Sequence, residues 1–184
     1  MCGRYFLDFD AVNFASFGAE ERGKRDLRPN DTAPAIVRAP SGDEVRRMQW
    51  GFENDKGTRL INARSETMRE RPAFRALADR QRCALPASGY YEWRGDGQQY
   101  DIARRDGAVF YLAGLYRMGR QCAEFVILTQ PPVPGIARFH DRMPLLLPDR
   151  TALDAWLDGK DMRFADEALL SIEPRGDEQL SFFD

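Results

Sequence analysis

The sequence predicts an α+β fold with a largely antiparallel β core and flanking helices. Short runs rich in β-branched and aromatic residues follow one another through the second half of the chain. Turn signals such as Gly95-Asp96-Gly97 and Asp106-Gly107 separate these runs. Segments with helical character are few, and successive strands with few helices between them favour antiparallel pairing over an alternating βαβ order. We therefore expect hairpin-connected strands with helices packed outside them.

The first half of the chain is expected to mix strands, loops and two helices. Asp10 is a candidate N-cap for the first helix, and Pro72 restricts the first half of the second. The elements expected there are an extended segment at 4–7, a helix at 10–17, a charged surface loop at 20–28, strands at 35–37 and 45–50, a polar loop at 51–58 and a helix at 65–80.

The second half is expected to be mainly β. The proline-rich residues 131–134 interrupt the strand pattern. The elements expected there are strands at 83–85, 90–93, 100–103, 109–115, 125–128, 139–144 and 145–147, and a final helix at 151–157.

Composition places limits on what the protein can be. The 184 residues suit a single domain, 1–184, and 43% hydrophobic content is typical of a folded chain. No stretch reaches the ~20 apolar residues of a membrane span, and no apolar signal region begins the chain, so a cytoplasmic location is expected. A net charge of −2 gives no global attraction to nucleic acid.

The three cysteines are Cys2, Cys83 and Cys122, an odd number without a Cys-x-x-Cys pair, which favours reduced thiols over disulfides. Together with His140 they could in principle make a Cys₃His zinc site. Structural zinc sites use closely spaced cysteine pairs, which this chain lacks. We expect neither a metal nor a cofactor.

Cys2 follows the initiator methionine directly. Removal of Met1 would leave an α-amine and a thiol on adjacent carbons, with ordinary pKa values of about 7.7–8.0 and 8.5. Such an aminothiol captures an aldehyde first as an imine and then as a five-membered thiazolidine ring. Gly3 leaves the approach unobstructed. The alternative is that Cys2 is an incidental residue of a flexible terminus.

Three further residues are candidates for chemistry. Glu92 lies among aromatic residues in a predicted strand, so loss of hydration should raise its pKa, unless it faces water at a rim. His140, the sole histidine, suits proton transfer but could equally be structural. Asn62 could orient a nucleophile, and Arg64 could hold a phosphate, although both also suit the entry to a helix.

The order of these residues along the chain matches a known pattern. The matching segments are Met1-Cys2-Gly3-Arg4-Tyr5, Ala33-Pro34, Trp50-Gly51, INARSET at 61–67, Arg82 to Pro86, Tyr91-Glu92-Trp93, Ile127-Leu128-Thr129 and His140-Asp141-Arg142-Met143-Pro144. Together they resemble the SOS response-associated peptidase (SRAP) family of abasic-site processing proteins.

The resemblance implies a barrel-like fold and a specific activity. It implies that Met1 is removed autocatalytically, which is a cysteine peptidase reaction. It then implies that Cys2 attaches covalently to the aldehyde of an abasic site in single-stranded DNA, which is a lyase-type reaction. It assigns catalysis to Cys2, Asn62, Glu92 and His140. It assigns DNA contacts to Arg4, Pro34, Trp50, Arg64, Trp93, Thr129 and Arg142.

The implied partner is abasic single-stranded DNA, bound by a monomer that associates with the nucleoid and not with a membrane. Arginines for phosphates and tryptophans for bases are the usual means of binding single strands without sequence preference. Two other functions stay open. The protein could be a thiol peptidase that acts on other proteins through Cys2 and His140, or a non-catalytic binder of single-stranded nucleic acid.

Overall fold

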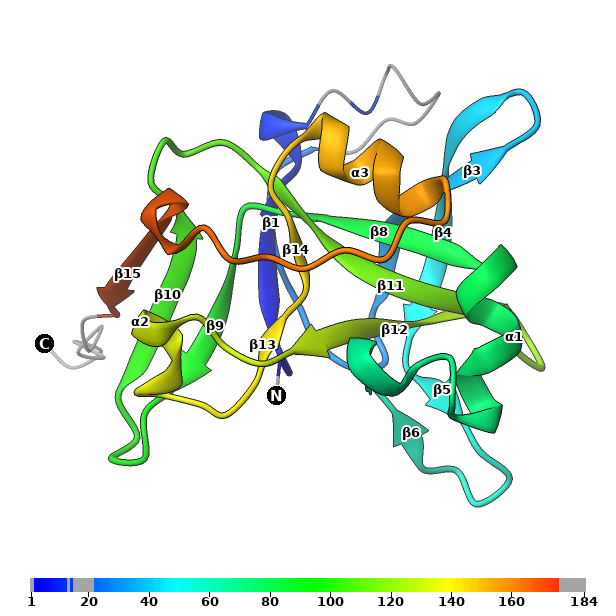
Figure 1. Ribbon diagram of the computed structural model, residues 1–184, viewed down its shortest axis with the longest axis horizontal. Helices are drawn as coiled ribbons and strands as arrows, with labels where there is room; N and C mark the ends of the chain where they lie inside the picture. The colour runs from blue at the N-terminus through cyan, green and yellow to red at the C-terminus, as the bar shows by residue number, and fades with distance from the viewer. Residues whose placement is uncertain (1, 13, 15–21, 176–184) are drawn as a thin grey trace, which may run out of the picture.

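Two β-sheets face each other across the main hydrophobic core of this α+β protein (Figure 1). The structure is a computed structural model that describes residues 2–12, 14 and 22–175. The first sheet has the strand order β15-β10-β9-β1-β2, and all its pairings are antiparallel. Its strands are β1 (Tyr5–Asp8), β2 (Lys24–Leu27), β9 (Gly89–Trp93), β10 (Gln99–Arg104) and β15 (Leu170–Pro174).

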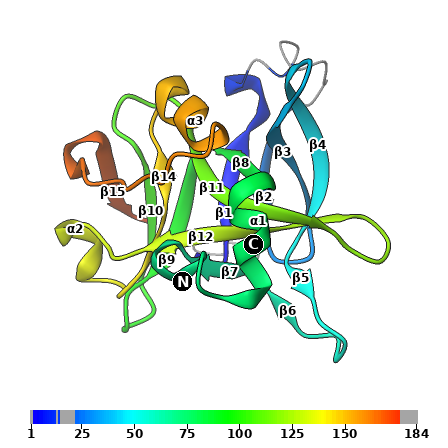
Figure 2. The ribbon, with the colours of Figure 1, turned by 45° about the vertical axis from the view of Figure 1, so that its right-hand side comes forward.

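The second sheet has the order β13-β12-β4-β3-β8-β11-β14, with β7 beside β12. Only the pairings of β12 with β4 and with β7 are parallel. Because β12 also pairs with β11, the strands curve into a barrel-like core (Figure 2). The strands are β3 (Thr32–Ala39), β4 (Gly42–Trp50), β7 (Asn62–Arg64), β8 (Arg82–Ala87), β11 (Phe110–Met118), β12 (Ala123–Gln130), β13 (Met143–Pro144) and β14 (Leu146–Leu147).

Strand β8 separates two cores and is buried along its whole length. Cys83 and Leu85 belong to the core between the sheets, whereas Ala84 faces the second core. Side chains on alternate faces of a strand produce this division. Helices α1 (Pro72–Arg80) and α3 (Arg150–Leu157) cover the second core, and the Trp156 indole of α3 donates to the Cys83 carbonyl.

The remaining elements are short. They are the hairpin strands β5 (Phe52–Glu53) and β6 (Arg59–Leu60), helix α2 (Pro134–Ala137), and 3-10 turns at Phe9–Ala11, Ser65–Thr67 and Glu167–Leu169. None of the described helices is long and apolar enough to cross a membrane.

A glycine allows β1 to lie close against β9. Phe6 pairs with Gly89, and a Cβ at Gly89 would lie 2.3 Å from the Phe6 ring and 2.7 Å from the Ile102 carbonyl oxygen. No side chain fits in that space. This contact fixes the register that brings the start of the chain alongside Glu92.

The predicted fold class is confirmed, and several predicted elements need correction. The charged residues 20–28 are not all loop, because residues 24–27 form β2 and pair by their backbone with β1. The helix predicted at 10–17 lies partly outside the described residues. Within them, Asp10 belongs to a 3-10 turn capped by Asp8. The polar residues 51–58 include the start of the β5–β6 hairpin.

Two more corrections concern helices and the last strand. The helix predicted at 65–80 is a 3-10 turn followed by α1, and Pro72 occupies the first turn of α1, where a missing N–H costs nothing. Ser65 makes no capping hydrogen bond. The prolines at 131–134 lead into α2. Residues 170–174, where no element was predicted, form β15, which pairs with β10 and alternates apolar Leu170 and Ile172 with polar Ser171 and Glu173.

Candidate functional site

Three segments that are distant in sequence meet at the carboxyl end of β12. Strand β7 lies parallel to β12, with Asn62 opposite Ile127 and Arg64 opposite Thr129. Strand β13 pairs with β12 on the other side, with Pro144 opposite Thr129. The segments 61–67, 127–129 and 140–144 thus form one surface.

Asn62 connects this surface to the start of the chain. Its side-chain Nδ2 donates to the backbone carbonyl of Cys2 at 2.9 Å, and Asn62 is only 8% exposed. Trp50 supports Asn62 from behind, because the indole Nε1 donates to the Ile61 carbonyl at 2.9 Å. Cys2 is therefore held by a buried amide whose own position is fixed by the core.

Glu92 is a buried carboxyl group, 2% exposed, on the inner face of β9. Burial raises its pKa from an ordinary 4.5 to about 7. The positive charge of the chain's amino terminus opposes this rise in pKa, and the Asp141 carboxylate adds to it. Among the described residues, Oε1 of Glu92 has no hydrogen-bond partner. Glu92 can therefore take up or release a proton near neutral pH.

The Cys2 thiol is fully buried. Burial raises the pKa of the thiol well above its ordinary value, and the nearby Glu92 carboxylate raises it further. The thiol is therefore uncharged at neutral pH, and two negative charges on Cys2 and Glu92 together are unfavourable. Passing the thiol proton to the Glu92 carboxylate would create a thiolate while the net charge of the pair stays at −1.

His140 lies beside two groups that compete for its Nδ1 atom. The backbone N–H of Arg142 donates to Nδ1 at 3.0 Å, while an Asp141 carboxylate oxygen lies 2.7 Å from the same atom. A neutral ring accepts the first bond, and a protonated ring donates to Asp141. Desolvation lowers the His140 pKa, which favours the neutral ring with its hydrogen on Nε2.

Arg142 is held by a bidentate ion pair. Its two terminal nitrogens contact the Glu66 carboxylate at 2.6 and 2.7 Å, and one also donates to the Thr129 carbonyl at 2.7 Å. Hydrogen bonds from Arg142 hold the pKa of Glu66 at about 2, so this carboxylate stays ionised. The Glu66–Arg142 pair therefore fixes the loop that carries His140.

These residues surround an open pocket of about 400 Å³, called here the Asn62 pocket. Its lining residues are Asn62, Ala63, Arg64, Thr129, His140, Asp141 and Arg142. Arg64 is exposed at this pocket, and among the described residues its guanidinium has no acidic partner. A free guanidinium beside a polar pocket is a suitable contact for a phosphate. Cys2 and Glu92 lie beneath the pocket and do not line it.

Comparison with known proteins agrees with this geometry. The family model described as SOS response associated peptidase (SRAP) matches residues 1–183. The chain belongs to the SRAP family. It is 32% identical over 171 residues to the abasic site processing protein YoaM of Bacillus subtilis (80% of this chain, 75% of YoaM). It is also 32% identical over 180 residues to the abasic site processing protein YedK of Escherichia coli (85% and 79%).

The fold also matches solved structures. A crystal structure of a Bordetella bronchiseptica protein superimposes with a TM-score of 0.80 at 22% identity, covering 95% of this chain and 100% of that one. A Bacteroides thetaiotaomicron protein gives a TM-score of 0.77 at 20% identity, covering 96% and 93%. This SRAP-family chain therefore has the same fold as these two solved structures.

Two residues expected to contact DNA lie in the interior of this SRAP-family chain. Trp50 has no exposed surface, stacks on Phe125 and lies 5.5 Å from the Tyr5 ring, so it presents no face to a base. Pro34 is buried in β3, opposite Arg47. The prediction of stacking by Trp50 is therefore wrong in this structure, since its role is to support Ile61.

Arg4 and Trp93 lie together, on the outer face of the first sheet. Arg4 pairs with Asp26 and lies over the Tyr91 ring at 4.8 Å. Trp93 is 40% exposed, with its ring centre 6.3 Å from that of Tyr91. The expected DNA-contact residues thus separate into a pocket group (Arg64, Thr129, Arg142), a sheet-face group (Arg4, Trp93) and two core residues.

Two acidic residues at this SRAP-family site were not predicted from the sequence. Glu66 orients Arg142, and Asp141 contacts His140 and raises the pKa of Glu92. Each lies next to or near a predicted site residue, but adjacency alone does not reveal its partner. Among the described residues, no group of three or more His, Cys, Asp or Glu side chains could hold a metal ion.

Replacing Glu92 by glutamine is expected to stabilise the fold at high pH. The folded-state pKa of Glu92 is about 7 against an ordinary 4.5, so its contribution to stability is present below pH 4.5 and is lost as pH rises through 7. The loss amounts to about 3 kcal/mol. Thermal unfolding should show a higher Tm for Glu92→Gln than for wild type at pH 8 and no difference near pH 4.

The matched control is Glu173→Gln, which changes an exposed carboxylate of the same sheet. It should leave Tm unchanged at both pH values. A Glu92→Gln protein less stable than wild type at pH 8 would contradict the assignment of a raised pKa.

Proposed function

We propose that this protein processes abasic sites in single-stranded DNA by crosslinking to them through Cys2 after loss of Met1. The observation that carries the proposal is the buried pair of Cys2 and Glu92, with Asn62 holding the Cys2 carbonyl beneath a pocket lined by His140. Relatives named as abasic site processing proteins support the same substrate.

The first step exposes the reactive amine. Hydrolysis of the peptide bond between Met1 and Cys2 consumes one water, releases methionine and leaves a free α-amine on Cys2. Asn62 binds the Cys2 carbonyl, on the other side of that residue, so it keeps Cys2 in place while the preceding bond is cut. The aminothiol then lies beneath the Asn62 pocket, beside Asn62, and reaction with a sugar in the pocket requires the Cys2 amine to become accessible from it.

The second step forms the crosslink. The abasic sugar is mostly a closed hemiacetal and opens to an aldehyde when a proton moves from the C1′ hydroxyl to the ring oxygen. The amine adds to C1′, and loss of water gives an imine. The sulfur then bonds to C1′ and closes the thiazolidine. The aldehyde oxygen leaves as water with one hydrogen from the amine and one from the thiol.

Glu92 and His140 have complementary roles in this sequence. Glu92, with a pKa of about 7, is fitted to accept the thiol proton and to return a proton to a leaving oxygen. The bond from the Arg142 N–H to Nδ1 and the lowered pKa favour neutral His140, which would act as a proton donor toward the sugar. Arg64 is placed to bind a phosphate of the same strand.

Intact mass spectrometry tests the proposal. The purified protein is expected to lack the mass of one methionine residue. After incubation with a single strand that contains one abasic site, it should gain the mass of the strand less one water. A strand with a tetrahydrofuran spacer has no aldehyde and should add nothing. Retention of Met1 with no adduct to the abasic strand would contradict the proposal.

A further inference from the structure

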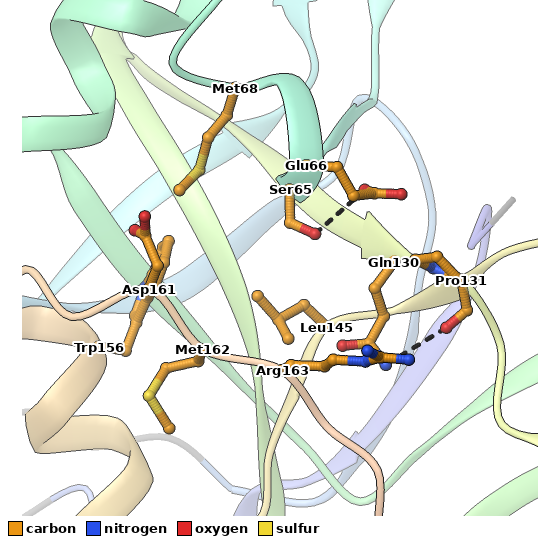
Figure 3. Close-up of a pocket in the computed structure, with 10 residues that line it drawn as sticks. All are labelled: Ser65, Glu66, Met68, Gln130, Pro131, Leu145, Trp156, Asp161, Met162 and Arg163. Atoms are coloured by element: carbon orange, nitrogen blue, oxygen red, sulfur yellow. Dashed lines mark hydrogen bonds between the residues drawn. The ribbon is translucent and has the colours of Figure 1, made fainter.

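A second pocket lies beyond the Glu66–Arg142 pair and has no part in the chemistry described above. It measures about 350 Å³ and is called here the Met162 pocket (Figure 3). Its lining residues are Ser65, Glu66, Met68, Gln130, Pro131, Leu145, Trp156, Asp161, Met162 and Arg163. The volume lies within the range of small-molecule sites.

The two pockets are neighbours with a shared wall. Arg64 and Thr129 line the Asn62 pocket, and the next residue of each segment, Ser65 and Gln130, lines the Met162 pocket. The Glu66–Arg142 ion pair joins one pocket to the other, because Glu66 lines the second and Arg142 the first. A DNA strand bound in the Asn62 pocket would reach the Met162 pocket by crossing the Glu66–Arg142 pair.

The charges at the Met162 pocket allow an anionic strand to approach. Both of its carboxylates are neutralised, since Glu66 pairs with Arg142, and Asp161 pairs with Arg69 and Arg82. Arg163 has no acidic partner among the described residues, and Figure 3 shows its side chain extending toward Gln130 and Pro131. Arg163 therefore supplies the pocket with a positive charge that no acidic side chain of the described residues pairs with.

The pocket combines apolar side chains with polar ones that already have protein partners, which leaves those polar groups little capacity to read a base: Ser65 donates to Glu66, and Asp161 pairs with Arg82. Met68, Leu145 and Met162 supply thioether and aliphatic surface. The Gln130 amide is already used, because its nitrogen donates to the Phe164 carbonyl at 2.6 Å and its oxygen accepts from the Phe164 N–H at 2.9 Å. Thioether and aliphatic groups can contact the ring of any base, so these walls do not distinguish one base from another.

We propose that the Met162 pocket accepts the base of the nucleotide next to the abasic residue in the same DNA strand. Arg163 contacts the phosphate of that nucleotide. The inference rests on the proposed function, since it requires an abasic residue in the Asn62 pocket. It adds that the substrate is recognised through one flanking base, bound without preference for its identity.

The test compares crosslinking rates on strands that differ beside the abasic site. In one strand a tetrahydrofuran spacer replaces the nucleotide on the 5′ side, in another the nucleotide on the 3′ side, and in a third neither. Loss of the base on one side only should slow crosslinking at subsaturating DNA by about tenfold, a typical value for the loss of one base contact. Exchange of that base among A, C, G and T should change the rate less than threefold.

Two variants locate the effect. Met162→Asp places a charge in the pocket. The variant should react with the unmodified-neighbour strand as slowly as wild type reacts with the spacer strand. In the variant, the spacer should cause no further loss of rate. Arg163→Ala should weaken binding and lower its salt dependence by about one phosphate contact. The controls are Met118→Asp, which changes an exposed methionine on the β11–β12 hairpin, and Arg75→Ala on α1, which should both react like wild type.

The outcomes separate this inference from the function on which it rests. Rates that are indifferent to both neighbours, or a spacer penalty that persists unchanged in Met162→Asp, overturn the inference while adduct formation stands. If no strand gives an adduct, the proposed function fails and the inference fails with it.

Discussion

Replacement of Cys2 by alanine is expected to abolish the denaturation-resistant adduct with abasic single-stranded DNA. An alanine variant prepared with a free α-amine on residue 2 can still form an imine, but it has no sulfur to close the thiazolidine, and an imine hydrolyses. The adduct should therefore be absent on a denaturing gel and reappear when borohydride reduces the imine. This difference isolates the role of the sulfur from that of the amine.

Cys122→Ala is the matched control for this experiment. Cys122 is the exposed cysteine of the three, so it is the thiol most accessible to a stray aldehyde. Its loss should leave the adduct yield at the wild-type level. Equal adduct from wild type and Cys2→Ala, without reductant, would show that another residue makes the bond.

Replacement of Glu92 by glutamine is expected to slow crosslinking by about 10²–10⁴-fold, the usual contribution of a positioned acid or base. Glutamine has nearly the same shape but cannot exchange a proton with the Cys2 thiol. Single-turnover rates measured from pH 5 to 9 should show an inflection near pH 7 in wild type, where the Glu92 carboxyl titrates, and the variant should lose this inflection while keeping the one near pH 8 that the attacking α-amine causes.

Misfolding cannot account for this loss of rate, because the same substitution is expected to raise Tm at pH 8. The control Glu173→Gln should retain both the rate and the inflection. A Glu92→Gln protein that crosslinks within threefold of wild type, or one that keeps the inflection near pH 7, would assign the proton transfer to another group.

Local patterns in the sequence determined much of the fold. The hairpins of the second half follow from turn signals and alternation, and the structure has β9, β10, β11 and β12 where the pattern placed them. Strand β2 was not predicted because three of its four residues are charged, and β15 was not predicted because its alternation covers only four residues before Pro174. They are held by backbone pairing to β1 and β10, which a sequence pattern does not reveal.

For the site, the sequence by itself determined which groups have suitable chemistry. The aromatic neighbours of Glu92 predicted loss of hydration, and the structure buries that carboxyl and raises its pKa to about 7. The place of Cys2 after Met1 predicted an aminothiol, because that property depends only on neighbours along the chain. Such properties are local, and a sequence records them directly.

The tertiary structure alone decided which of these groups meet. Strand β12 brings Asn62 and Arg142 to one end of the sheet, and the pairing of β1 with β9 places Cys2 near Glu92. The tertiary structure also buries Trp50 in the core and brings Glu66 into contact with Arg142. Contacts between residues tens of positions apart depend on register and on which face each side chain takes, and these are settled only when the sheets pack against each other.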